Sequence, residues 1–197
     1  MYDVPSYPFF QNMQSAASSA FEEAVRSEMG SVQLDILVNN AGIAPEIPFE
    51  ETSVETFEAV INVNLKAPYF LTQAASNFIR NDGRIINIST GFTRVAGPER
   101  SIYAASKGGI ETLTLALAPL FAAKGITVNA VRPGVTATDM NKDWLADPAV
   151  YAGAASMSAF GRIGATEDIA DIVVFLASEE ARWITGQFID ATGGSRL

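Results

Sequence analysis

DILVNNAG, residues 35–42, joins a run of apolar side chains directly to a turn of small and polar ones. A continuous apolar run halted by turn residues is typical of a strand buried on both faces of a parallel sheet. Similar strands are predicted at 83–90, 126–131 and 187–190, and helices at about 53–80, 102–124 and 167–178. This alternation predicts an α/β fold in which a doubly wound parallel sheet has right-handed crossovers.

The composition restricts both the fold and the classes of function. With 197 residues, 48% of them hydrophobic, the chain is expected to form a single domain with one core. A net charge of −9 disfavours binding to nucleic acid or anionic membranes, because both reward clustered positive charge. The absence of Cys and His excludes disulfides, thiolate or imidazole metal sites and Ser-His-Asp triads. Any proton transfer must therefore use Tyr, Lys or carboxylate groups.

The start of the chain carries no sign of export. Residues 1–20 lack the basic start and apolar centre of a signal peptide, and no apolar run of about 18 residues occurs, so a cytoplasmic protein is expected. Residues 1–13 show neither helical nor alternating period and are expected to be irregular, and residues 14–30 are expected to form a helix.

Tyr103 and Lys107 stand at the start of the predicted helix at 102–124. Their spacing of four residues places the phenol and the ammonium on one face of the helix, about 5–6 Å apart at Cβ. A neighbouring cation lowers the pKa of a phenol, so the pair is a candidate acid and base near neutral pH. Taken alone, this spacing is common, and a simple surface pair is its default interpretation.

Asn64 lies on the apolar face of the predicted helix at 53–80, where a polar side chain needs hydrogen-bond partners. Pro68 lies four residues further on and has no N–H, so in a regular helix the main-chain carbonyl of Asn64 would lack its usual donor. Two interpretations stay open: a kinked packing helix, or an inward-facing carbonyl that can bind something else.

The polar candidates gather at one edge of the predicted sheet. Residues 39–42, 89–90 and 133–138 follow the carboxyl ends of three predicted strands, and Tyr103 opens the helix after the second of them. In open α/β sheets, ligands bind in the crevice outside those ends. The residues therefore predict a binding site at this edge.

The order and spacing of these segments, with GRIG at 161–164 and TGQ at 185–187, resemble the short-chain dehydrogenase/reductase family, in particular its β-ketoacyl carrier-protein reductase-like branch. The resemblance runs from about residue 16 to residue 197. It implies an oxidoreductase that transfers a hydride between NAD or NADP and a small carbonyl or alcohol substrate.

The resemblance also implies a role for each matching residue. Tyr103 would exchange a proton with the substrate oxygen, and Lys107 would lower the pKa of Tyr103 and hydrogen-bond the nicotinamide ribose. Asn64 would hold, through its main-chain carbonyl, a water of a proton relay. Further cofactor-binding residues would be Asn39, Ala41 and Gly42 on the floor of the site, Pro133 and Gly134, and Val135 and Thr138 at the carboxamide.

The family's catalytic serine position is occupied differently here. Counting back thirteen residues from Tyr103, the spacing of the family, leads to Thr90 rather than Ser89. A threonine hydroxyl can donate the same hydrogen bond to a substrate carbonyl, although its methyl group restricts χ1. The sequence therefore favours Thr90, with Ser89 as the alternative.

One part of the family's pattern has no match. Members begin with a strand, a Thr-Gly-x-x-x-Gly-x-Gly loop and a helix, and no Gly-x-x-x-Gly-x-Gly occurs in this sequence. That loop binds the pyrophosphate, and a residue after the second strand selects NAD or NADP, so the cofactor preference cannot be predicted. The sheet is expected to keep about four strands. The strand at 34–39 would then form an open edge with the apolar Ile36 and Val38.

Residues 139–164 are predicted to form a lid over the site, and the apolar character of this segment indicates a partly hydrophobic substrate. Its large apolar residues are Met140, Trp144, Leu145, Tyr151, Met157 and Phe160. Apolar residues spread around the two long helices predict a homodimer or homotetramer. The alternative function is a non-catalytic remnant of the family that serves as an oligomer partner or scaffold.

Overall fold

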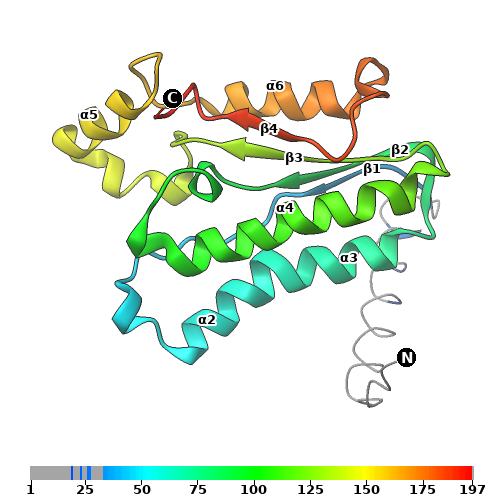
Figure 1. The fold of residues 1–197 in the computed structure, drawn as a ribbon, viewed down its shortest axis with the longest axis horizontal. Helices are drawn as coiled ribbons and strands as arrows, with labels where there is room; N and C mark the ends of the chain where they lie inside the picture. The colour runs from blue at the N-terminus through cyan, green and yellow to red at the C-terminus, as the bar shows by residue number, and fades with distance from the viewer. Residues whose placement is uncertain (1–18, 20–22, 24–25, 28–32, 197) are drawn as a thin grey trace.

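Four parallel strands form the sheet of the computed structural model, which describes residues 19, 23, 26–27 and 33–196. The strands are β1 (Leu34–Asn39), β2 (Ile79–Ile88), β3 (Thr127–Pro133) and β4 (Phe188–Ala191), in the order β1-β2-β3-β4 (Figure 1). The predicted α/β class and the four-stranded parallel sheet are confirmed. The segment expected to be irregular, 1–13, and most of the helix expected at 14–30 lie outside the described residues.

Helices connect the strands and lie on both sides of the sheet. The α-helices are α2 (Val54–Ile61), α3 (Ala67–Ala75), α4 (Ser101–Ala122), α5 (Pro148–Met157) and α6 (Thr166–Ala177). Short 3-10 turns occur at η1 (Phe49–Glu51), η3 (Gly91–Thr93), η4 (Pro98–Arg100), η5 (Asp139–Asn141), η6 (Trp144–Ala146) and η7 (Glu179–Ala181). α3 and α4 pack on one side of the sheet and α6 on the other, which gives the doubly wound arrangement (Figure 1).

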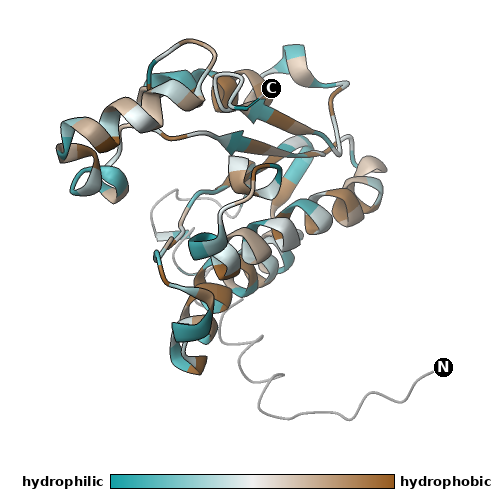
Figure 2. Cartoon of the chain, turned by 60° about the vertical axis from the view of Figure 1, so that its left-hand side comes forward, coloured by the Kyte–Doolittle hydropathy of each residue, from teal (hydrophilic) through white to brown (hydrophobic). Residues whose placement is uncertain are grey.

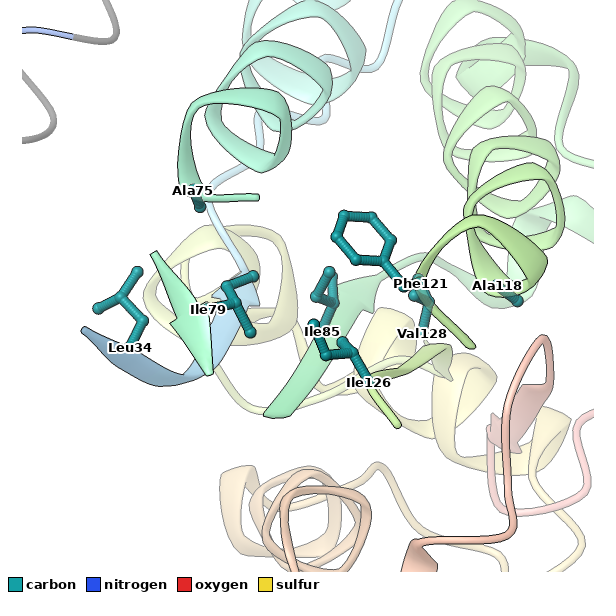
Figure 3. Packing of buried hydrophobic residues seen from close by; sticks show 8 residues of the cluster. All are labelled: Leu34, Ala75, Ile79, Ile85, Ala118, Phe121, Ile126 and Val128. Carbon is teal, nitrogen blue, oxygen red and sulfur yellow. The ribbon is translucent and has the colours of Figure 1, made fainter. Parts of the chain in front are cut away.

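Two groups of buried apolar side chains fill these layers. The group on the α3 and α4 side consists of Leu34, Ala75, Ile79, Ile85, Ala118, Phe121, Ile126 and Val128 (Figure 3). The group on the α6 side is centred on Ile86, Val131, Leu176 and Ala181. Because successive side chains of a strand point to opposite faces, Ile85 and Ile86 belong to different groups. The continuous apolar run in β2 is therefore buried on both faces, as predicted.

The helix expected at 53–80 is in fact two α-helices joined by a π-helical turn, η2 (Asn62–Lys66). In this turn the N–H of Ala67 donates to the carbonyl of Asn62, five residues back. The extra residue accommodates Pro68, whose ring would collide with a carbonyl four residues back in a regular α-helix. The predicted end of the helix is also wrong, because α3 ends at Ala75 and Ile79 already belongs to β2.

β1 is the edge strand of the sheet within the described part of the chain, where it pairs with β2 alone. α3 packs against β1 from one side, whereas α6 packs against β2, β3 and β4. Ile36 and Val38 are 46% and 40% exposed, in agreement with the expected open edge. Figure 2 shows that hydrophobic residues recur along the strands and along the helices.

Among the helices of the described residues, none combines the length and the apolar character needed to cross a membrane.

Candidate active site

Thr90 and Tyr103 line one pocket of about 390 Å³ at the carboxyl ends of β2 and β3. Thr90 comes two residues after β2, and its hydroxyl accepts the N–H of Phe92 at 3.3 Å. The Phe92 ring meets the Tyr103 ring edge to face, with centroids 6.4 Å apart and an interplanar angle of 76°. The structure therefore places in one pocket the two residues whose hydroxyl groups were predicted to contact the substrate oxygen.

The environment of Tyr103 favours the neutral phenol. Burial raises the pKa of Tyr103, and hydrogen bonding by Thr90 and the positive charge of Arg100 oppose this rise without cancelling it. Arg100 precedes Tyr103 by three residues, donates to the carbonyl of Ala44 and forms an ion pair with Glu46 at 2.6 Å. The expected lowering of the Tyr103 pKa by Lys107 is not seen here, because the cation that acts on the phenol is Arg100.

Lys107 is buried beneath the site, with only 3% of its surface exposed. Its Nζ donates to the carbonyl of Ile88 at 2.7 Å, and burial lowers the pKa of Lys107 to about 8. A Cβ atom at Gly42 would lie 3.3 Å from this Nζ and 3.4 Å from Asn64 Oδ1. Glycine thus keeps the space above Lys107 open, and the exposed Ala41 lies beside it. A cofactor held at this floor would therefore meet no side chain from residue 42.

Asn64 is fully buried in the π-helical turn, and its side-chain amide holds the loop after β1. Its Oδ1 accepts the N–H of Ile43 at 2.9 Å, and its Nδ2 donates to the carbonyl of Ile43 at 2.9 Å. The same Nδ2 lies 3.0 Å from Ser106 Oγ, which donates to the carbonyl of Tyr103 at 2.7 Å. Asn64 therefore connects the predicted cofactor floor to the helix that carries Tyr103.

The side chain of Asn39, a residue predicted to line the cofactor floor, points into the interior. Its Nδ2 donates to Thr72 Oγ1 at 3.1 Å and to Asn87 Oδ1 at 2.8 Å. Asn87 in turn donates to Thr114 Oγ1 at 2.9 Å. The Asn39 amide thus belongs to a buried polar chain that ties β1 to β2 and the helices, and only its main chain can face the cofactor floor.

Ser89 and Thr90 point to different surroundings. Ser89 is 2% exposed, and its hydroxyl donates to Glu111 Oε1 at 2.7 Å, away from the pocket. Thr90 lines the pocket beside Tyr103. The geometry therefore supports Thr90 as the hydroxyl that faces the substrate.

The end of β3 contributes Pro133 to the pocket, and the segment after it contributes Gly134 and Val135. A Cβ at Gly134 would lie 2.8 Å from Thr192 Cα, so this close approach of two main chains requires glycine. Thr138 is not a lining residue: it precedes η5, and its N–H donates to the carbonyl of Thr136 at 2.9 Å.

The segment predicted as a lid supplies one wall of the pocket. Met140, Trp144 and Met157 line it, together with Asn141 and Val150. Leu145, Tyr151 and Phe160 do not line it, and Phe160 is 78% exposed. The apolar lining agrees with a partly hydrophobic substrate.

Sequence reasoning missed Arg100, Phe92 and Glu111. Arg100 could have been suspected, because it is a cation placed directly before α4 and three residues before Tyr103. Glu111 lies four residues after Lys107 on the same helix and so shares its helical face. The approach of Phe92 to Tyr103 depends on the path of a loop, which spacing does not determine.

The fold and this site define an α/β protein with a parallel sheet and a pocket at the carboxyl ends of its strands, the usual place for a ligand in such sheets. A family model described as enoyl-(acyl carrier protein) reductase matches residues 13–196. Dehydrogenase OXI1 of Cochliobolus heterostrophus is 41% identical over 165 residues, which cover 82% of this chain and 71% of that protein. The NADPH-dependent aldehyde reductase-like protein of Arabidopsis thaliana is 38% identical, over 93% of this chain and 66% of its own length.

A solved structure of the angucycline C-6 ketoreductase LanV with bound NADP aligns with a TM-score of 0.84 and 42% identity, over 92% of this chain and 70% of LanV. The chain belongs to the short-chain dehydrogenase/reductase family, whose members are oxidoreductases that act on carbonyl and alcohol groups with a nicotinamide cofactor.

Proposed function

We propose that this chain reduces a ketone or aldehyde, or oxidises the corresponding alcohol, with Tyr103 as the acid or base. One observation carries the proposal: the hydroxyl-bearing side chains of Thr90 and Tyr103 share one wall of a pocket, and the ammonium of Lys107 is buried on the same helical face. Two hydroxyl donors on one wall can both reach a single substrate oxygen, which polarises a carbonyl for reduction.

Each residue then has a separate task. Thr90 donates a hydrogen bond to the substrate oxygen, and Tyr103, neutral because burial raises its pKa, gives its proton to that oxygen. Lys107 uses one N–H on Ile88 and has further donor capacity for ribose hydroxyls above Gly42. Asn64 keeps the floor segment at Ile43 in place through its two hydrogen bonds.

The cofactor supplies or accepts the hydride when it is bound. Gly42, Lys107, Tyr103 and Val135 are the residues that would hold its nicotinamide end. The NADP in LanV and the NADPH dependence in the name of the Arabidopsis relative support NADPH as the first cofactor to test. The apolar lining by Phe92, Met140 and Trp144 supports a substrate with an apolar body beside its carbonyl group.

The test is turnover of a panel of aromatic and aliphatic ketones at saturating NADPH or NADH. Tyr103→Phe should lower kcat by about a hundredfold or more, because general acid catalysis contributes that much and the ring is retained. Cofactor affinity should stay nearly unchanged. Tyr151→Phe is the matched control, since Tyr151 is 43% exposed on α5 and does not line the pocket. Full activity of Tyr103→Phe would remove Tyr103 from the mechanism, whereas an inactive parent chain would favour the non-catalytic alternative.

We also propose a homodimer or homotetramer that forms through the outer faces of α3 and α4. Leu115 and Leu120 are 52% and 69% exposed on α4, and Tyr69 and Leu71 are 46% and 39% exposed on α3. Apolar side chains gathered on two adjacent helices favour association with a second copy. Light scattering at micromolar concentration measures the mass, and a stable species of 21.0 kDa would contradict the proposal.

A further inference from the structure

Thr90 lies on a short segment, residues 89–94, whose position depends largely on side-chain contacts. Thr93 Oγ1 lies 2.9 Å from the carbonyl oxygen of Thr90 and 2.8 Å from Glu111 Oε1. The Ser89 hydroxyl donates to the same Oε1 at 2.7 Å. Ser89 and Thr93, which stand before and after Thr90, are therefore both hydrogen-bonded to the carboxylate of Glu111.

That carboxylate belongs to α4, the helix that carries Tyr103 and Lys107. Glu111 is 7% exposed, and burial by itself raises the pKa of its carboxyl. Hydrogen bonds from Arg132, Ser89 and Thr93 outweigh burial and hold the pKa below its ordinary value. Glu111 is therefore anionic at neutral pH, and an anion is a stronger hydrogen-bond acceptor than a neutral group.

Arg132 fixes the orientation of this carboxylate. Its Nε donates to Glu111 Oε1 at 2.6 Å and its Nη2 to Oε2 at 2.7 Å, a bidentate pair. The same guanidinium lies over the Phe188 ring, 4.8 Å from its centroid. Since Arg132 stands directly before Pro133, which lines the pocket, β3, α4 and the segment 89–94 meet at Glu111.

The other side of the segment is also closed. A Cβ at Gly91 would lie 2.9 Å from Thr192 Cγ2, so the main chain passes close to the residues after β4. Arg94 forms an ion pair with Asp190 at 3.1 Å and donates to the carbonyl of Ser195 at 2.6 Å. The segment is thus held between Glu111 and the end of β4 with the residues that follow it, and losing the Glu111 side would leave Thr90 free to shift.

We propose that Glu111 is a positioning residue for the reaction, which acts through Thr93 and Ser89 to hold Thr90 beside Tyr103. The proposal rests on the proposed function, because it assumes that Thr90 contacts the substrate. If Glu111 served stability alone, its ion pair with Arg132 would be sufficient. Two of the three residues that Glu111 binds come instead from the segment 89–94.

Thr93→Val and Thr93→Ser form the central pair of variants. Valine keeps the shape of threonine and removes the hydroxyl, whereas serine keeps the hydroxyl. Thr93→Val should lower kcat about tenfold with little change in cofactor KM, because small misplacements of a catalytic group are costly. Thr93→Ser should retain activity. Equal activity of the two variants would overturn the role of the hydroxyl.

A double-mutant cycle separates positioning from general damage. Thr90→Val removes the group that Glu111 is proposed to position, so Thr93→Val should cost nothing further in that background. Thr114→Val is the matched control, since Thr114 is fully buried on α4 and bonds Asn87 rather than the segment 89–94. It should leave kcat nearly unchanged. Additive losses of Thr90→Val and Thr93→Val would overturn the proposal.

A readout independent of turnover is the titration of Tyr103, followed by NMR with labelled tyrosine. Hydrogen bonding by Thr90 lowers the Tyr103 pKa, so Thr90→Val should raise it. Thr93→Val should also raise it, and so should Glu111→Gln, because an amide oxygen is a weaker acceptor than a carboxylate. No rise in Thr93→Val would refute the positioning role even in an inactive protein. Inactivity of the parent chain with a normal titration pattern would refute only the proposed function.

Discussion

The carboxyl ends of β2 and β3 differ from the outer side of β1 in how far the rest of the described chain covers and pairs their side chains. At the first region, the charged groups of Lys107 and Glu111 are buried and each has hydrogen-bond partners within the described residues. At the second, Ile36 and Val38 are 46% and 40% exposed on an edge strand. Within the described residues, the buried charges of the candidate site thus have hydrogen-bond partners, whereas Ile36 and Val38 stay partly uncovered. The two regions can be tested separately.

The largest expected effect concerns cofactor affinity. The sequence has no Gly-x-x-x-Gly-x-Gly, so the 197-residue chain should bind NADPH with a Kd near about 1 mM rather than low micromolar, a loss of about a thousandfold. Reduced nicotinamide mononucleotide, which lacks the adenosine half, should serve as hydride donor within about tenfold of NADPH. Calorimetric titration and steady-state kinetics measure the two quantities. Low-micromolar binding of NADPH would mean that residues outside the described part, or a second subunit, bind the phosphates.

The next effect distinguishes the two hydroxyl groups after β2. Thr90→Val should lower kcat about a hundredfold, because it removes a donor to the substrate oxygen. Ser89→Ala removes a hydroxyl that only faces Glu111, so its loss should be about tenfold or less. Kinetic constants of both variants decide the matter. A costlier Ser89→Ala would show that the thirteen-residue spacing points to the wrong hydroxyl.

A smaller effect follows from the burial of Lys107. Its pKa is lowered from 10.5 to about 8 in the folded chain, so between these values the unfolded chain binds more protons. The free energy of unfolding should therefore increase with pH in that range, by about 2 kcal/mol between pH 7 and about pH 9.5. Lys107→Met should lose this increase, and Lys124→Met should keep it. Urea unfolding at the two pH values measures it, and parallel pH profiles for all three proteins would contradict the prediction.

The smallest effect on stability is expected at the edge. Val38→Thr should change the free energy of unfolding by less than about 0.5 kcal/mol, because the side chain is already exposed, and should reduce aggregation. Val128→Thr places the same hydroxyl at a fully buried position of β3 and should cost about 1–3 kcal/mol. Urea unfolding and light scattering compare the two. A large loss in Val38→Thr would show that β1 is covered in solution.

Much of this fold follows from local patterns. The apolar run in β2 predicts burial on both faces, and the neighbouring Ile85 and Ile86 confirm it by facing different helices. The π-helical turn could not be predicted from period alone, because one added residue leaves the apolar spacing nearly helical on either side. Pro68 was the available signal, and it indicated an irregularity without specifying its form.

The site was less accessible to sequence reasoning where side chains are shared between distant elements. Spacing places Tyr103 and Lys107 on one helical face, but it does not show that Arg100 acts on the phenol. Asn39 belongs to the predicted floor, and its amide turns inward because Thr72 and Asn87 offer buried partners. These hydrogen bonds depend on which donors and acceptors lie close together in the folded chain. The sequence alone does not show which distant residues become neighbours.

The hydrogen bonds of the Asn64 amide limit which amino acids can replace asparagine at this position. It exchanges two hydrogen bonds with the main chain of Ile43, in the way that one residue of a strand pairs with a neighbouring strand. Aspartate could accept the N–H but would set its negative charge against the Ile43 carbonyl, and leucine could do neither. The complementarity of one amide to one peptide group thus restricts the position to asparagine, independently of any part the residue plays in moving protons.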